Sequence, residues 1–160
     1  MNIILFGPPG AGKGTQAQKL VENHNYYQIS TGDLLRNEAN KKSNIGVEIE
    51  KLISNGEFVS DEIVNDLLKQ TLSKLNSHDP IIFDGYPRSI SQASNLEQIL
   101  NDFKRKIDFV ISLNVSRDII QKRIMGRVTC EKCNITLNKY FDQERIKKLS
   151  CSGKYLVKRK

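Results

Sequence analysis

The sequence predicts an α/β protein built on an open, doubly wound parallel sheet. Three short apolar runs, residues 2–6, 80–84 and 107–113, have the length and composition of buried strands, and the stretches between them have helical periodicity. Strands that alternate with helices need crossover connections, and crossover connections join parallel strands. In such a sheet the functional site is expected at the carboxyl ends of the strands.

The elements follow in order along the chain. The run 2–6 passes directly into the turn Gly7-Pro8-Pro9-Gly10, and a helix is expected to start near Lys13. Apolar residues recur at helical spacing over 63–75, after Ser60 as a suitable N-cap, and again over 96–103. The runs 80–84 and 107–113 supply the second and third strands.

Two segments fit this alternation poorly. Residues 30–59 carry two short helical patterns and no clear strand, and Ser30-Thr31-Gly32-Asp33 resembles a capping turn, so a helical insertion is predicted there. Residues 127–160 hold all three cysteines and little periodicity. They are predicted to form a small appended unit.

Length and composition exclude several classes of protein. With 160 residues and 38% apolar residues, one domain of ordinary size is expected. The sequence has no apolar run long enough to span a membrane, and its first residues lack the basic start of a signal peptide, so a cytoplasmic location is expected. Three cysteines in such a protein indicate metal binding or chance and not a disulfide framework.

The net charge of +7 is concentrated at one end of the chain. Residues 1–126 carry 15 basic and 15 acidic side chains, whereas residues 127–160 carry ten basic and three acidic ones. A basic end of this kind is typical of a nucleic-acid arm, of a cover over a polyphosphate, or of a plain solvated surface. Composition alone leaves these three alternatives open.

The strongest motif is the glycine-rich segment from Gly7 to Thr15. It has the spacing of a phosphate-binding loop, Gly-x4-Gly-Lys, with its hydroxyl one place later than usual, and it lies between a predicted strand and a predicted helix. Consecutive backbone N–H groups and the positive end of the helix would surround a phosphate. Lys13 would reach the β- and γ-phosphates, and Thr15 would face the metal ion.

A second motif is the acidic residue that ends the strand 80–84. A carboxylate at Asp84 can hold a hydrated Mg²⁺ beside a nucleotide, although a plain strand-end turn is the alternative. Phosphoryl transfer also needs cations on the oxygens that gain charge, which favours arginines. Arg36, Arg88, Arg123 and Arg127 are the candidates, each with a surface ion pair as the alternative role.

With these motifs the sequence resembles adenylate kinases of the long, bacterial type. The resemblance covers all 160 residues and rests on five segments. Four of them begin at Gly7, Ile29, Phe83 and Arg123, and the fifth is the cysteine-containing segment that ends Lys158-Arg159-Lys160. It implies a P-loop NTPase-like core (1–29 and 60–126), an AMP-binding insert (30–59) and a lid (127–160). It also implies a monomer that transfers a phosphoryl group reversibly from MgATP to AMP to give two ADP, without nucleic-acid or membrane partners.

The resemblance assigns site residues by position. Those expected to be catalytic are Lys13, Arg88, Arg123 and Arg127, and those associated with Mg²⁺ are Thr15 and Asp84. ATP contacts are expected at Gly10, Ala11, Gly12, Lys13, Gly14, Thr15, Arg123, Arg127, Thr136 and Leu137. AMP contacts are expected at Thr31, Arg36, Glu57, Phe58, Val59, Gly85, Tyr86, Pro87, Arg88, Gln92 and Arg159. A hydroxyl at Thr31, together with Gln92, favours AMP over pyrimidine monophosphates.

The sequence departs from the family pattern in two places. The zinc-bearing lid has two Cys-x-x-Cys pairs, but here Cys130 and Cys133 are joined only by Cys151, with Lys148 and Lys154 where a fourth thiolate would stand. Three thiolates do not close a tetrahedral site, so zinc is a doubtful cofactor. The sequence also stops at Lys160, where the family continues with a last strand and helices. A truncated kinase, poorly active by itself, is therefore expected.

The sequence is also compatible with two other functions. A P-loop kinase of another nucleoside monophosphate would share the motifs and differ in its preferred acceptor. A basic P-loop fragment that binds nucleotide or nucleic acid without turnover would differ by a steep salt dependence of binding to random DNA.

Overall fold

The computed structural model describes residues 1–132, 135–149, 151 and 154–158. The chain divides into two compact units. The first comprises Met1–Phe6 with Lys13–Ser112, and the second comprises Gly7–Gly12 with Leu113–Lys160. These two units do not correspond to the core, insert and lid that the sequence predicts. That three-part division remains a prediction.

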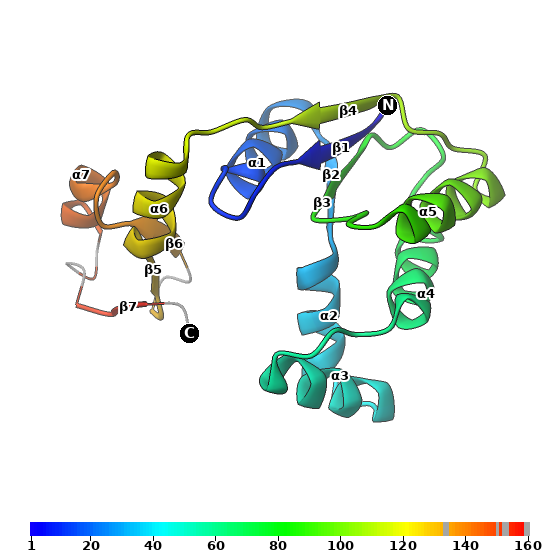
Figure 1. Ribbon diagram of the computed structural model, residues 1–160, viewed down its shortest axis with the longest axis horizontal. Coiled ribbons are helices and arrows are strands. Elements are labelled where there is room, and N and C mark those ends of the chain that lie inside the picture. The colour runs from blue at the N-terminus through cyan, green and yellow to red at the C-terminus, as the bar shows by residue number, and fades with distance from the viewer. Residues whose placement is uncertain (133–134, 150, 152–153, 159–160) are drawn as a thin grey trace. The chain divides into compact units, whose positions relative to one another are not determined.

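The first unit is built on a four-stranded parallel sheet (Figure 1). Its strands, in the order β2-β3-β1-β4, are β1 (Asn2–Phe6), β2 (Tyr27–Ser30), β3 (Ile81–Asp84) and β4 (Phe109–Ser112). The three runs predicted as strands are confirmed as β1, β3 and β4, with slightly tighter bounds for the last two. The parallel α/β class is confirmed with them.

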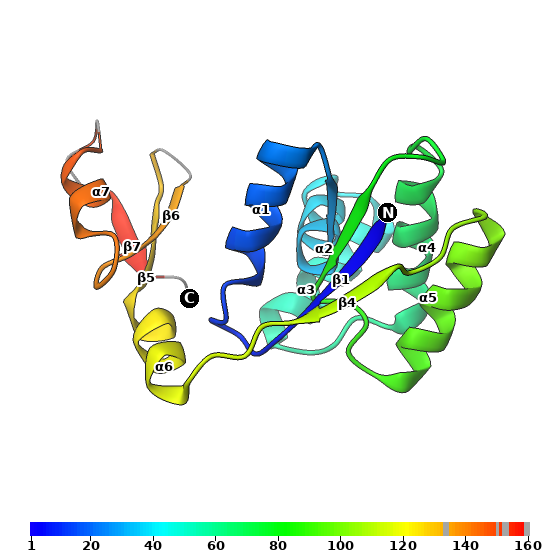
Figure 2. The ribbon, with the colours of Figure 1, turned by 90° about the horizontal axis from the view of Figure 1, so that it is seen from above.

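Helices cover both faces of this sheet. Figure 2 shows α1 (Lys13–His24) on one face and α4 (Asp61–Leu72) with α5 (Ile90–Asp102) on the other. Alternate residues of β1 therefore enter different cores: Ile3 and Leu5 pack with Ala17 of α1, while Ile4 packs with Leu68 of α4 and Leu96 of α5. The predicted N-cap is confirmed, since the Ser60 Oγ accepts a hydrogen bond from the Ile63 N–H at 3.4 Å.

The predicted helical insertion consists of two helices, α2 (Thr31–Asn40) and α3 (Asn44–Asn55). Figure 1 shows them as a hairpin that extends away from the sheet. Ser30 stands at the N-cap of α2, but its side chain makes no capping bond within the described residues, so the predicted capping turn is only partly right. Ser30 is the last residue of β2, and a strand thus runs directly into the helix.

The second unit contains a three-stranded antiparallel sheet that the sequence did not reveal. The strand order in this sheet is β6-β5-β7. The helices and strands of the unit are α6 (Arg117–Gly126), β5 (Arg127–Cys130), β6 (Ile135–Asn138), α7 (Gln143–Lys147) and β7 (Leu156–Lys158). Val128, Cys130, Leu137 and Cys151 form its small buried core. Strands of three or four residues give too few alternations to be recognised as a pattern.

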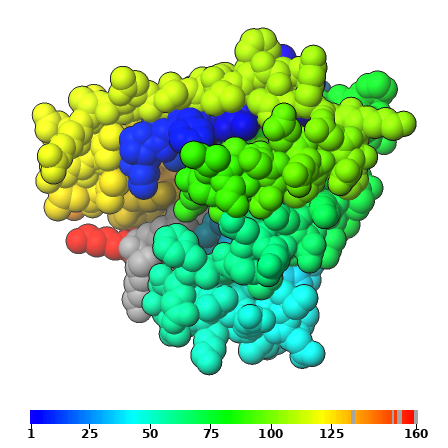
Figure 3. All heavy atoms as spheres, turned by 45° about the vertical axis from the view of Figure 1, so that its right-hand side comes forward, coloured from blue at the N-terminus to red at the C-terminus, as the bar shows by residue number. Residues whose placement is uncertain are grey.

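Strand β4 forms an apolar edge of the first sheet. Val110 is 63% exposed and Phe109 is 56% exposed, although both lie in the strand that hydrogen-bonds β1. Figure 3 shows the yellow-green part of the chain, to which β4 belongs, at the surface. A groove of about 320 Å³ between this edge and α5 is lined largely by apolar side chains. An apolar strand edge of this kind is a template for pairing with another chain.

We expect the substitution Val110→Lys to reduce aggregation of the chain, which is expected to be a monomer, at high concentration, because a charge on an edge strand opposes strand pairing. Static light scattering over a concentration series measures the effect. Val47→Lys, at a helical residue that is 56% exposed, is the matched control and should scatter like the unmodified chain. Equal scattering by all three proteins would contradict this view of the edge.

Candidate active site

The glycine-rich segment connects β1 to α1, as the sequence predicts. Gly7, Gly10 and Gly12 all have positive φ, and the Ala11 N–H donates to the Pro8 carbonyl at 3.1 Å. Glycine is needed at residue 10, since φ is 82° and an added Cβ would lie 3.0 Å from Ile124. Glycine-rich turns between a strand and a helix can direct backbone N–H groups toward an anion, which is how phosphate-binding loops work.

Arg123 holds this turn from α6, within the second unit. Its Nη1 donates to the carbonyl oxygen of Ala11 at 2.8 Å and to that of Gly10 at 3.3 Å. A fixed cation therefore lies beside the backbone of the predicted phosphate loop. Arg127 begins β5 and is exposed.

The two other residues expected at ATP in this unit lie on β6, an edge strand of its sheet. The Thr136 hydroxyl lies 3.5 Å from that of Thr129, and Leu137 is buried. A buried side chain at residue 137 means that a contact with ATP there would come from the backbone.

Asp84 occupies the carboxyl end of β3, where the sequence places a metal-associated carboxylate. Its Oδ2 accepts a hydrogen bond from Gln28 Nε2 at 3.0 Å and lies 3.6 Å from the position of a Cβ on Gly14. Burial raises the pKa of Asp84, and the charges of Lys13 and Arg88 and the Gln28 hydrogen bond oppose that rise. The carboxylate thus lies against the first turn of α1.

This arrangement fits a hydrated Mg²⁺. Carboxylate and hydroxyl oxygens are its preferred ligands, and an added side chain at Gly14 would occupy the space beside the Asp84 oxygen. Thr15 is exposed in the same first turn of α1. Gln28 was not identified from the sequence, because β2 has no apolar pattern that would mark its polar residues as facing a site.

A second group of predicted residues gathers at the loop after β3. The Thr31 hydroxyl donates to the Gly85 carbonyl at 3.4 Å, and Arg88 Nε donates to the same oxygen at 2.7 Å. Gly85 has φ 80°, and an added Cβ would lie 3.2 Å from Arg88 Nη2. A hydroxyl and a guanidinium are therefore held on one carbonyl, at the edge of the sheet where α/β proteins bind ligands.

Gln92 joins this group through two hydrogen bonds of its side-chain amide. Its Oε1 accepts from the Arg88 N–H at 2.7 Å, and its Nε2 donates to Asp61 Oδ1, also at 2.7 Å. Asp61, the first residue of α4, was not identified from the sequence. No local pattern indicates a contact between residues 31 positions apart.

The side chain of Tyr86 belongs to the protein core and not to the surface of the site. Tyr86 is buried in the core, and its hydroxyl donates to Asn65 Oδ1 at 3.0 Å. Burial, assisted by the charge of Asp61, raises the pKa of Tyr86 to about 12. Only the backbone at residue 86, which precedes Pro87, is thus available to a ligand.

Arg36 lies on α2 and forms an ion pair of 2.5 Å with Asp33 in the same helix. Because both side chains are about half exposed, the pair adds little stability and leaves the guanidinium accessible to a phosphate. Glu57, Phe58 and Val59 lie in the loop between α3 and α4, where the Phe58 ring is 92% exposed. Arg159 lies outside the described residues.

Two of the three cysteines lie side by side in the second unit. The sulfur atoms of Cys130 and Cys151 are 3.3 Å apart, and both residues are buried. Cys133 is not among the described residues. Within the described ranges, no three His, Cys, Asp or Glu side chains cluster as metal ligands.

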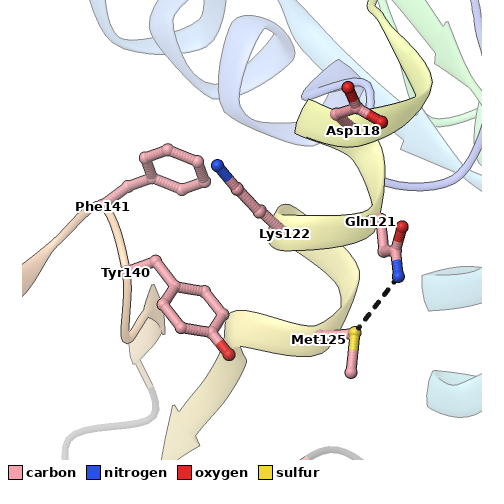
Figure 4. Close-up of a pocket in the computed structure, with 6 residues that line it drawn as sticks. All are labelled: Asp118, Gln121, Lys122, Met125, Tyr140 and Phe141. Carbon is pink, nitrogen blue, oxygen red and sulfur yellow. Dashed lines mark hydrogen bonds between the residues drawn. The ribbon is translucent and has the colours of Figure 1, made fainter.

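The second unit also has a hollow of about 650 Å³ between α6 and the turn after β6. Figure 4 shows Asp118, Gln121, Lys122 and Met125 on the helix, opposite Tyr140 and Phe141. None of the predicted site residues that the structure describes lines it. Among the described helices, none combines the length and the apolar character needed to cross a membrane.

Comparison with known proteins supplies a family. The family model for adenylate kinase matches residues 5–151. The chain is 66% identical over 160 residues to the adenylate kinase of Pelagibacter ubique. The aligned region covers all of this chain and 75% of that protein. It is 44% identical over 138 residues to the adenylate kinase of Mycoplasma mycoides, and that aligned region covers 86% of this chain and 64% of the relative. The identity to the adenylate kinase of Novosphingobium aromaticivorans is 49% over 133 residues, which are 83% of this chain and 62% of that protein. The chain thus spans about two thirds to three quarters of the length of these relatives.

Proposed function

This chain belongs to the adenylate kinase family, and we propose that it transfers the γ-phosphoryl group of MgATP reversibly to AMP, giving two ADP. The family consists of nucleotide-binding phosphotransferases that use Mg²⁺ with ATP. One observation carries the proposal for this chain. Thr31, Arg88 and Gln92 converge on the loop after β3, in the unit that also holds Lys13 and Asp84.

The phosphates of ATP are proposed to bind the segment from Gly10 to Thr15. Its backbone N–H groups, the first turn of α1 and the Lys13 ammonium supply positive charge for the β- and γ-phosphates. Thr15 and Asp84 would hold the hydrated Mg²⁺, which neutralises charge on the transferred group when it is bound. Arg123 and Arg127, with the β6 residues Thr136 and Leu137, are proposed to contact ATP from the second unit.

The AMP phosphate is proposed to meet Arg36 and Arg88, and the adenine to meet Thr31 and Gln92. Both guanidinium groups lie in the first unit, and the ion pair of Arg36 is weak enough to be exchanged for a phosphate. No side chain of this group needs to act as a nucleophile, because phosphoryl transfer relies on positioning and electrostatic stabilisation. Glu57 to Val59, Gly85 to Pro87 and Arg159 are proposed as further AMP contacts.

We expect AMP to be phosphorylated faster than CMP, UMP or GMP. A site built to hydrogen-bond one base leaves buried polar groups unpaired when another base binds. Initial rates with each monophosphate and MgATP, with the nucleoside diphosphates separated by chromatography, measure this preference. CMP or UMP accepted as fast as AMP would assign the chain to another class of nucleoside monophosphate kinase.

Zinc is proposed to bind weakly. The described thiols Cys130 and Cys151 suit a metal, but a structural site needs four ligands, and lysines occupy the places where the fourth is expected. Protein purified without added metal should contain far less than one zinc per chain, and chelation should leave its melting temperature unchanged. Stoichiometric zinc by atomic absorption, lost together with stability on chelation, would contradict this.

We also propose that the protein is monomeric and cytoplasmic.

A further inference from the structure

The side-chain amide of Gln92 is held at both of its ends. Asp61 Oδ1 accepts a hydrogen bond from Nε2 at 2.7 Å, and the Arg88 N–H donates to Oε1 at 2.7 Å. The three residues come from different places in the first unit: the start of α4, the loop after β3, and α5. Gln92 also occupies the first turn of α5, where its own N–H is capped by the Ser89 hydroxyl at 3.1 Å.

These two contacts fix which way the amide faces. An ionised carboxylate can only accept hydrogen bonds, and a backbone N–H can only donate them. Turning the Gln92 amide over would place its oxygen against the Asp61 carboxylate and its NH₂ against the Arg88 N–H. Both contacts would then be repulsive, so the chemistry of the two partners determines the orientation.

We propose that Asp61 is a positioning residue that sets the preference for a 6-aminopurine over a 6-oxopurine through Gln92. The inference rests on the proposed function, in which Gln92 contacts the base of the monophosphate. In the fixed orientation, Nε2 keeps one further N–H and Oε1 keeps one further lone pair. Adenine offers the complementary edge, with an acceptor at N1 and a donor at N6.

A 6-oxopurine carries the opposite pattern, with a donor at N1 and an acceptor at O6. To pair with it, the Gln92 amide would have to turn over and lose both of its fixed contacts. Asp61 therefore acts against the wrong base without touching the ligand. Asp61 also places a negative charge in the first turn of α4, which stabilises the N-terminal end of a helix, and the neighbouring Glu62 does the same.

The test compares binding of AMP with that of inosine 5′-monophosphate, whose base differs at the N1 and C6 edge alone. Calorimetric titration gives both dissociation constants without requiring turnover. In Asp61→Asn the new amide can donate to a turned Gln92, so we expect the preference for AMP to fall about tenfold, mainly through tighter binding of the inosine nucleotide. Asp61→Ala removes the repulsion and should shift the preference in the same direction.

Two controls separate this role from a structural one. Glu62→Gln removes a first-turn charge of α4 at an exposed residue and should leave the preference unchanged. In a Gln92→Ala background, Asp61→Asn should have no further effect, because Asp61 acts through that amide. Thermal unfolding checks that each variant is folded.

The outcomes also separate this inference from the proposed function. If the unmodified chain prefers AMP and both Asp61 variants keep that preference, the inference is wrong and the proposed function stands. If the unmodified chain binds the two nucleotides equally, the proposed base contact of Gln92 is wrong, and the inference fails with it.

Discussion

The Lys13→Ala variant is expected to form ADP from MgATP and AMP at least about a hundred times more slowly than the unmodified chain, with its fold intact. Lys13 is the first residue of α1, and it lies close enough to Asp84 for its charge to oppose the rise in the pKa of that carboxyl that burial causes. Its ammonium is the group proposed to meet the β- and γ-phosphates, whose charge shifts most during transfer.

Lys19→Ala is the matched control, since Lys19 is an exposed lysine on the same helix. It should retain the full rate of ADP formation. Circular dichroism of both variants checks the fold. An unchanged rate in Lys13→Ala would remove the basis for a phosphate site at the glycine-rich segment.

The Arg88→Ala variant is expected to lower kcat/KM for AMP by roughly a hundredfold or more, because a charge-assisted contact to the acceptor phosphate is lost. Arg88 is held by its Nε on the Gly85 carbonyl, so that within the described part of the chain both terminal nitrogens remain for a phosphate. Calorimetry should show weakened binding of AMP and unchanged binding of MgATP.

Arg117→Ala, at an exposed arginine that begins α6, is the control for general loss of positive charge. Both nucleotides should bind to it as they bind to the unmodified chain. Weakening of AMP and MgATP alike in Arg88→Ala would show that Arg88 supports the fold and not the acceptor.

The sequence predicts the first unit better than the second. The apolar runs of β1, β3 and β4 are visible because strands of a parallel sheet are buried on both faces or, at β4, rich in β-branched residues. Strand β2 has one fully buried residue, Ile29, and polar neighbours on both sides, so no apolar run marks it. In the second unit the short strands are stabilised by pairing with one another and not by a local pattern.

The site divides in a similar way. The glycine-rich turn between β1 and α1 and the place of Asp84 at the end of β3 could be predicted, because both depend on local spacing beside a strand. The Asp61 contact with Gln92 and the Gln28 contact with Asp84 could not, since each joins residues from separate elements. The Arg123 contact with the loop carbonyls joins α6 to a turn more than a hundred residues earlier.

The most direct test of the central claim starts from ADP alone. Incubated with MgADP, the chain should form ATP and AMP in equal amounts, because two ADP are the products of the proposed reaction and the transfer is reversible. Lys13→Ala should form neither at a comparable rate. Folded protein that yields no ATP, or that releases AMP and inorganic phosphate without ATP, would contradict the account.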